Sequence, residues 1–186
     1  ARGVTMSIHR NPGFQRTRRR LLVGLAAAPV ALAAIPALTQ ANQITGAKIV
    51  KLEKSKDQWQ ALLEPDAYRV LFKEATERPF TSSLDDEKRD GVYICAACYL
   101  PLFESTAKFD SGTGWPSFFQ PIDGAIATKR DFKMIIPRTE YHCIRCGGHQ
   151  GHVFNDGPRP TGQRWCNNGV ALEFVPADEP LPELRT

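Results

Sequence analysis

Residues 143–154 read CIRCGGHQGHVF, so a CxxC cysteine pair stands directly before two histidines. A second CxxC pair lies 44 residues upstream, at Cys95 and Cys98. A two-residue spacer lets both thiolates of one pair face a single ion, and two pairs complete a tetrahedral four-thiolate shell with no open position. We therefore expect a structural Zn²⁺ site that ties two distant hairpins together, with the ligands Cys95, Cys98, Cys143 and Cys146.

Two other interpretations of these cysteines stay open. Two disulfides would suit an exported protein, and a single CxxC pair can be a redox pair. The presence of two pairs together favours the metal site over both.

Cys166 is left without a sequence partner, in the stretch RWCNN at residues 164–168. On a strand, Arg164, Cys166 and Asn168 would point to one face because side chains alternate. The Arg164 guanidinium would then lower the pKa of the thiol, and Asn168 would donate hydrogen bonds to a bound oxygen. The alternative is an inert buried cysteine. Arginine, tryptophan and asparagine neighbours favour a reactive thiol.

His149 and His152 lie in a stretch that we expect to form a Gly-rich turn, fixed in space by the preceding cysteine pair. Imidazoles titrate near neutrality and are natural proton donors. The alternatives are metal ligands, although four thiolates already fill a shell, or structural hydrogen bonding. We expect the latter role for His142, beside Cys143.

Residues 111–118, SGTGWPSF, predict a rigid loop. Glycines allow a tight turn, and Pro116 biases Trp115 toward an extended backbone. An indole presented in this way suits a methyl or sulfonium-like group. A tryptophan of the core is the alternative.

The sequence predicts one domain over residues 55–176, with a small helical start and a mostly antiparallel β body. Ser55 and Gln58 form a capping-box pattern before the first helix, and Pro65 starts a second. Residues 42–54 are a polar lead-in, 81–90 an exposed loop, and 177–186 a loose tail. Fourteen Gly and fourteen Pro favour short elements. The predicted strands are Val92–Cys95, Ala125–Thr128, Met134–Ile136, Tyr141–Ile144 and Val170–Val175.

The first 41 residues hold six arginines and no acidic residue. Arg18 and Arg19 precede an apolar run, Leu21–Leu38, which predicts a twin-arginine-like bacterial export signal that is removed from the chain. The expected location of the protein is therefore periplasmic or otherwise exported. The alternative is that the segment stays uncleaved as an N-terminal anchor. We expect membrane contact only in that case. Pro29 and Pro36 make that span weak.

The charge outside this signal argues against a nucleic-acid partner. Six of the 24 basic residues fall in residues 1–41, which leaves 18 against all 20 acidic residues, a net charge of −2. Phosphate binding needs basic charge on the folded part.

Together these motifs resemble the methionine-R-sulfoxide reductases of the B class over roughly residues 49–175. The resemblance rests on the two CxxC pairs, GTGWPSF at 112–118, HxGHVFxDGP at 149–158 and RxCxN at 164–168. It implies a mainly β fold with two packed antiparallel sheets, a short helical N-terminal part and a structural zinc site away from the active site.

The resemblance also implies the site residues. Trp115 and Phe154 would bind substrate, with the indole against the S-methyl group. Cys166 would be the nucleophile and Arg164 would tune its thiolate, while Asn168 and Asp156 would position the reacting groups. The implied catalytic set is Cys166, His149, His152, Asn168, Arg164 and Asp156.

The implied reaction is thiol-dependent reduction of methionine R-sulfoxide, free or in proteins. The Cys166 thiolate attacks the sulfoxide sulfur while an imidazolium protonates the oxygen, which leaves methionine and a sulfenic acid. Thr113 stands where some relatives have a resolving cysteine. We therefore expect an external thiol reductant, either a thioredoxin-like or glutaredoxin-like protein or a small thiol. Trp165, Gly169 and Gln150 depart from the usual Tyr, Ser and Leu.

Two other functions are carried forward. A cysteine hydrolase would use Cys166, a histidine and Asn168, but Asn168 lies only two residues from Cys166 and no helix N-terminus is evident. A non-enzymatic zinc module for protein or nucleic-acid binding would have no use for Cys166 or the two histidines.

Overall fold

Two short helices precede the strands in the computed structural model, which describes residues 49–133 and 136–186. Helix α2 (Lys56–Leu62) begins after Ser55, whose hydroxyl accepts from the Gln58 N–H while the Gln58 side chain accepts from the Ser55 N–H. Helix α3 (Pro65–Lys73) begins at a proline, whose fixed φ suits a first helical turn. The predicted capping box and both helices are confirmed.

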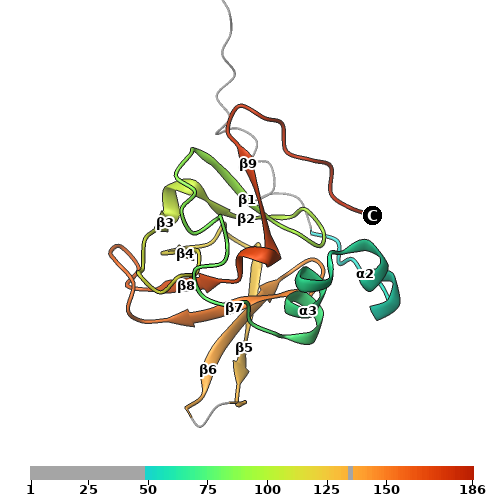
Figure 1. Cartoon of the computed structure of the whole chain (residues 1–186), viewed down its shortest axis with the longest axis horizontal. Helices are drawn as coiled ribbons and strands as arrows, with labels where there is room; N and C mark the ends of the chain where they lie inside the picture. Colours follow the sequence, from blue (N-terminus) through green and yellow to red (C-terminus); the bar gives the residue numbers. More distant parts are fainter. Residues whose placement is uncertain (1–48, 134–135) are drawn as a thin grey trace, which may run out of the picture. The chain divides into compact units, whose positions relative to one another are not determined.

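The strands form two antiparallel sheets, as predicted (Figure 1). The three-stranded sheet has the order β2-β1-β9, with β1 Gly91–Cys95, β2 Pro101–Glu104 and β9 Leu172–Pro176. The six-stranded sheet has the order β3-β4-β8-β7-β6-β5. Its strands are β3 Lys108–Phe109, β4 Ser117–Phe118, β5 Ile126–Asp131, β6 Arg138–Cys143, β7 His149–Phe154 and β8 Arg164–Asn167. Two 3₁₀ turns, η1 (Ser105–Ala107) and η2 (Gly169–Ala171), precede β3 and β9.

Aromatic side chains fill the space between the sheets. Phe103 of β2 stacks on Phe118 of β4 with ring centroids 4.1 Å apart, and Tyr93 of β1 meets Phe118 edge-on at 4.9 Å. Tyr141 of β6 contacts Phe103 from the side. All four rings are fully buried, so the core lies between the two sheets. Helix α3 packs beside β7 and carries the buried Leu71 (Figure 1).

The short strands differ most from prediction. β2, β3, β4 and β8 were not predicted as strands, because two to four residues between turns show little periodicity. β7 has six residues, and it was missed because its glycine reads as a turn signal. His149 and His152 lie on β7 and not in the expected Gly-rich turn. Gly151 between them marks a close approach, since a Cβ there would lie 1.8 Å from the Cys166 carbonyl oxygen of β8. Met134 and Ile135 of one predicted strand lie outside the described residues, and Ile136 is not in a strand.

Segment 177–186 has no helix or strand, but it is held to the domain at Arg185. The Arg185 N–H donates to the Cys98 carbonyl at 3.2 Å, and its guanidinium lies over the Tyr99 ring at 4.4 Å. Arg145 donates to the Arg185 carbonyl at 2.8 Å. The tail expected to be loose is therefore fastened beside the first cysteine pair.

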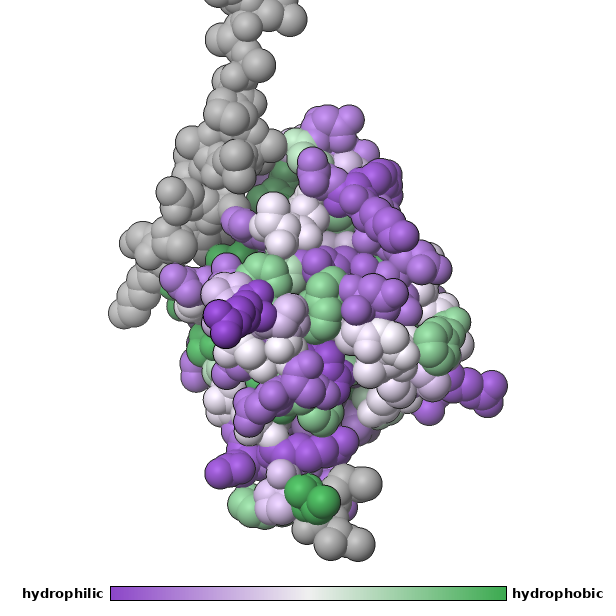
Figure 2. Space-filling view, turned by 90° about the vertical axis from the view of Figure 1, so that its left-hand side faces the viewer, coloured by the Kyte–Doolittle hydropathy of each residue, from purple (hydrophilic) through white to green (hydrophobic). Residues whose placement is uncertain are grey.

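The predicted export signal, residues 1–41, lies outside the described residues. Within the described ranges, no helix combines the length and the apolar character needed to cross a membrane. On the face seen in Figure 2, apolar side chains are scattered among hydrophilic ones.

Candidate active site and metal centre

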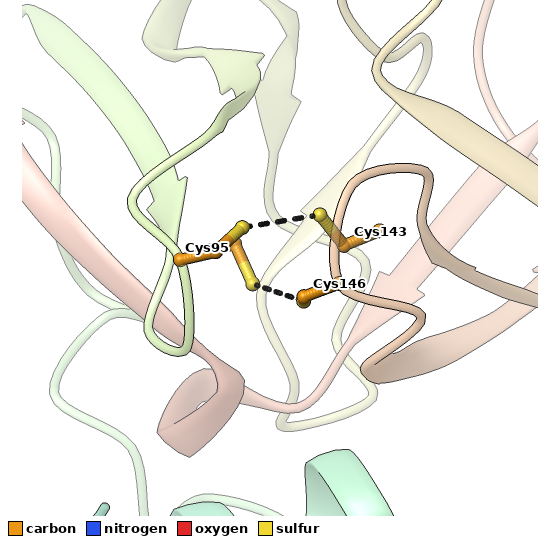
Figure 3. Close-up of side chains that lie close together, drawn as sticks. Cys95, Cys143 and Cys146 are labelled. Atoms are coloured by element: carbon orange, nitrogen blue, oxygen red, sulfur yellow. Dashed lines mark hydrogen bonds between the residues drawn. The ribbon is translucent and has the colours of Figure 1, made fainter. Parts of the chain in front are cut away.

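Four cysteines from two turns meet at one point. Cys95 ends β1, Cys98 lies in the turn that follows, and Cys143 and Cys146 flank the turn after β6. Their sulfur atoms all lie within 4.8 Å of one another, and all but the partly exposed Cys146 are buried. Figure 3 shows the side chains of Cys95, Cys143 and Cys146 directed toward one another across the gap between the two turns.

The sulfur spacing fits a tetrahedral metal shell. Cys95 and Cys146 have their sulfurs 3.7 Å apart, and those of Cys98 and Cys143 are 3.6 Å apart. Four thiolates about 2.3 Å from one ion would be separated by about 3.8 Å. A disulfide needs a sulfur–sulfur distance of about 2.05 Å. The geometry therefore favours a metal over two disulfides, and the cluster is consistent with a structural metal site.

Cys166 lies in the middle of the six-stranded sheet, on β8. It pairs in register with Ser117 of β4 on one side and with His152 of β7 on the other. Directly opposed residues of antiparallel strands project from the same face, with Cβ atoms about 5 Å apart. The structure thus brings His152 beside the thiol.

The next pair along the same two strands is Phe154 and Arg164. The Arg164 guanidinium lies 4.3 Å over the Phe154 ring and donates two hydrogen bonds to the Asp156 carboxylate, both at 2.9 Å. The predicted common face of Arg164 and Cys166 is thereby present. Asp156 holds the guanidinium in place.

Burial dominates the protonation of Cys166. It raises the pKa of the thiol above its ordinary value, while the charge of Arg164 and hydrogen bonding by Thr113 and Arg164 lower that pKa in part. The expected lowering by Arg164 is present, but the net shift of the pKa is upward. Burial therefore outweighs the contact with Arg164, and the neutral thiol is favoured.

His152 is held by a carboxylate from the end of β5. Its Nε2 lies 2.7 Å from Asp131 Oδ2, which also accepts from Arg138 at 2.9 Å. Burial lowers the pKa of His152, the hydrogen bond to Asp131 raises it, and the positive charge of Arg138 lowers it again. The net shift is downward, so the neutral imidazole is favoured before substrate binds.

His149, unlike His152, is not among the residues that line the pocket around Cys166. It is buried, its Nδ1 lies 2.7 Å from Glu140 Oε1, and its ring meets that of His152 edge-on at 5.5 Å. The other carboxylate oxygen of Glu140 faces His142 at 3.2 Å. His149 and His152 thus each have a carboxylate partner, but of these two only His152 lines the pocket around Cys166.

The loop before β4 presents Trp115, as predicted. Gly114 has a φ of +81°, and the Phe80 N–H donates to its carbonyl at 2.7 Å. A Cβ at Gly114 would lie 2.7 Å from the Phe80 ring, so glycine is needed here for both reasons. The Trp115 indole N–H donates to the Glu77 carbonyl at 3.3 Å, which fixes the plane of the ring.

Glu77 organises the residues that follow Cys166. Its carboxylate accepts from the Gly169 N–H at 2.6 Å and the Val170 N–H at 3.0 Å, and its own N–H donates to Asn168 Oδ1 at 3.0 Å. Burial raises the pKa of Glu77, and the two N–H donors lower it in part. Gly169 must be small here, since a Cβ would lie 1.9 Å from Ser82 Oγ.

Asn168 is therefore engaged with protein groups, since its Nδ2 also donates to the Gln150 carbonyl at 2.9 Å. It still lines the pocket around Cys166, whose volume is about 120 Å³. Pockets for whole small-molecule ligands measure roughly 300–1,000 Å³, so this one admits a side chain. Its lining is Thr76, Trp115, Arg138, Gly151, His152, Phe154, Cys166, Asn167 and Asn168.

The sequence analysis missed the groups that hold this pocket together. Asp131 and Glu77 act from segments that are far from Cys166 in the sequence, and Thr76 and Asn167 line the pocket without a motif of their own. Arg138 also lines the pocket, and the available signal for it was the stretch 138–140, RTE, just before the second cysteine pair.

Comparison with known proteins agrees with this geometry. Residues 63–176 match the SelR domain. The peptide methionine sulfoxide reductase MsrB of Pseudomonas putida strain W619 is 51% identical over 129 residues, which are 69% of this chain and 97% of that protein. The MsrB proteins of Pseudomonas entomophila strain L48 (50% identical, 69% of this chain, 98% of that protein) and Pseudomonas fluorescens strain Pf-5 (51%, 68% and 98%) are similar to the same degree.

Proposed function

Since this chain belongs to the SelR-domain family of methionine-R-sulfoxide reductases, we propose that Cys166 is the nucleophile and that His152 moves the proton. The protein is an oxidoreductase that reduces methionine R-sulfoxide to methionine. The observation that carries the assignment of roles is the register pairing of His152 with Cys166 at the pocket.

The resting pair is a thiol beside a neutral imidazole. The pKa of Cys166 is raised and that of His152 is lowered, both chiefly by burial. In the neutral ring Nε2–H donates to Asp131, so Nδ1 is the basic nitrogen. Nδ1 takes the thiol proton as the sulfoxide enters, and the Arg164 charge stabilises the thiolate that forms.

The thiolate then attacks the substrate sulfur. His152 returns the same proton to the sulfoxide oxygen, the sulfur–oxygen bond breaks, and oxygen is transferred to Cys166 as a sulfenic acid. The sulfoxide gains two electrons and becomes methionine, and the cysteine loses two. No other proton enters or leaves in this half of the reaction.

Binding is divided between two sides of the pocket. Trp115 and Phe154 provide aromatic faces for the S-methyl group, and the His152 side receives the oxygen. Asn168 holds the end of β8, and Asp156 orients the Arg164 guanidinium. His149 acts as a positioning residue whose ring packs edge-on against the His152 ring.

An external thiol resolves the sulfenic acid. The four cluster cysteines are committed to the metal, and Thr113 rather than a cysteine lies near Cys166. A thioredoxin-like or glutaredoxin-like protein, or a small thiol, forms a mixed disulfide with Cys166 and releases water. A second thiol then restores Cys166.

The metal of the cluster is Zn²⁺, because four thiolates in a closed tetrahedron form the shell typical of structural zinc. It would be held by Cys95, Cys98, Cys143 and Cys146. When bound it links the turn after β1 to the turn after β6, and it has no open position for substrate.

Residues 1–41 direct export to the periplasm. The support is the pair Arg18 and Arg19 before an apolar run without acidic residues. Lysine substitution of both arginines should retain the protein in the cytoplasm. Secretion that is unaffected by this substitution would contradict a twin-arginine route.

A single-turnover experiment tests the reaction. The reduced protein is mixed with methionine R-sulfoxide and no reductant, and a sulfenic-acid reagent is added. We expect one methionine per protein and one adduct on Cys166, and none with the S epimer. An intramolecular disulfide at Cys166 would contradict external resolution, and an adduct elsewhere would contradict the nucleophile.

A further inference from the structure

A line of buried amide groups joins the cysteine cluster to the active-site strand. Gln150 of β7 donates from Nε2 to Cys95 Sγ at 3.4 Å, and its Oε1 accepts from Asn167 Nδ2 at 3.2 Å. Asn167 Oδ1 in turn accepts from the Tyr141 hydroxyl at 2.7 Å. Cys95, Gln150, Asn167 and Tyr141 are all fully buried, so these groups have no solvent to exchange partners with.

The Cys95 sulfur determines which end of each amide group in this line donates and which accepts. A metal-bound thiolate only accepts hydrogen bonds, so Gln150 must turn its amide nitrogen toward Cys95. Its oxygen then faces Asn167, which must present its own nitrogen. Each amide has one donating and one accepting end, so the orientation of the first fixes the orientation of the second.

Asn167 directly follows Cys166 in the chain, so the orientation of Asn167 affects the main chain at Cys166. Its Nδ2 also donates to the Asn168 carbonyl at 2.8 Å, and its N–H donates to the Pro116 carbonyl at 2.9 Å. These bonds hold both the end of β8 and the loop that carries Trp115. Gln150 also accepts at its main-chain oxygen from Asn168.

We propose that Gln150 is a positioning residue through which the metal shell sets the orientation of Asn167 and thus the placement of Cys166. It acts by an N–H···S hydrogen bond to the thiolate of Cys95. The inference rests on the proposed metal site and on Cys166 as the nucleophile. Loss of an outer-shell partner of this kind typically weakens metal binding by roughly 10- to 100-fold.

The hydrogen bond can be observed without measuring activity. The whole chain is loaded with ¹¹³Cd²⁺ in place of zinc and labelled with ¹⁵N. We expect a scalar coupling between the bound cadmium and one side-chain amide proton of Gln150. Bound cadmium without this coupling overturns the inference alone. A chain that binds no cadmium overturns it together with the proposed metal site.

Two variants separate the two ends of the line. Gln150→Leu removes the donor to sulfur, and we expect a shifted cadmium resonance, metal affinity lower by roughly 10- to 100-fold, and shifted Asn167 side-chain and Cys166 main-chain resonances. Tyr141→Phe removes only the far hydroxyl, so the Asn167 resonances should shift while the cadmium resonance stays. Gln60→Leu makes the same change on an exposed helix position and should alter none of them.

The outcome that contradicts the inference is a folded Gln150→Leu protein with wild-type metal affinity or unshifted Asn167 resonances. Failure of Cys166 to act as nucleophile would leave the cadmium coupling in place. The two proposals therefore fail in different experiments.

Discussion

His152 of β7 and Cys166 of β8 are directly paired in the antiparallel ladder, so an imidazole and a thiol project side by side from one face of the six-stranded sheet. The pairing needs Gly151 as its neighbour, because a larger residue there would meet the Cys166 carbonyl. The strands themselves, and not a loop, therefore set the geometry of the reacting pair, which is the arrangement that best preserves a catalytic distance.

Removing either group that favours the thiolate should raise the pKa of Cys166 further. Arg164→Ala deletes the nearby positive charge, and Thr113→Val deletes a hydrogen bond. A neighbouring charge is commonly worth about one pKa unit or more, so alkylation of Cys166 near neutral pH should slow about tenfold in Arg164→Ala. The pH profile of iodoacetamide labelling measures this. Arg159→Ala, an exposed change nearby, is the control, and a lowered pKa in Arg164→Ala would contradict the assignment.

The two histidines should respond differently to substitution. His152→Asn should reduce turnover by roughly 10²–10⁴-fold, the usual contribution of a general acid–base group. His149→Asn should lower turnover less and stability more, because it leaves the buried Glu140 without its closest partner. Steady-state kinetics and urea unfolding of both variants test this. Equal losses of turnover in equally stable proteins would contradict the separation of roles.

Breaking the cysteine cluster should remove the metal and destabilise the fold while sparing the thiol chemistry of Cys166. Cys98→Ser deletes one of four ligands, and structural zinc sites contribute directly to folding. Metal content and melting temperature should both fall in this variant. Metal-free wild-type protein with an unchanged melting temperature, or disulfides within the cluster, would rule out the structural metal.

Much of this site was predictable because its chemistry is concentrated in short motifs. The spacing of Cys143 and Cys146 predicts a metal ligand pair, and the lone Cys166 beside Arg164 predicts a reactive thiol. The pairing of β7 with β8 was not predictable, because β8 has only four residues and Gly151 of β7 reads as a turn signal. The partners Asp131 and Glu77 were missed for a related reason, since tertiary contacts across distant segments leave no local pattern.

The direction in which the pKa of Cys166 is shifted could not be predicted from the sequence either. Arg164 two residues away suggests a lowered pKa, and this contribution is present. Burial outweighs it, and burial depends on the packing of β4 and the Trp115 loop around the thiol. A nearby charge in the sequence therefore predicts one contribution to the pKa shift of Cys166, but not the net direction of that shift.

Acid should destabilise the protein through Glu140. Burial raises the pKa of this carboxyl, but hydrogen bonds from His142 and His149 outweigh it and lower the pKa from 4.5 to about 2. A pKa that is lower in the folded state gives stability that is present above pH 4.5 and lost as the pH falls toward about 2. The free energy of unfolding of Glu140→Gln should vary less than that of the wild type in this window.

Urea unfolding at several pH values between 2 and 5 measures this difference. Glu53→Gln, an exposed substitution, should retain the wild-type slope. A Glu140→Gln protein whose stability changes as steeply as the wild type would show that the carboxylate carries no such contribution.

The central claim is that the Cys166 sulfur accepts the oxygen. The direct measurement is a dithiothreitol-driven assay with separated R and S epimers of methionine sulfoxide, on wild type and on Cys166→Ser, with metal content determined on the same samples. We predict reduction of the R epimer by the wild type alone, with equal metal in both proteins. Reduction of the R epimer at the wild-type rate by metal-loaded Cys166→Ser would contradict the account.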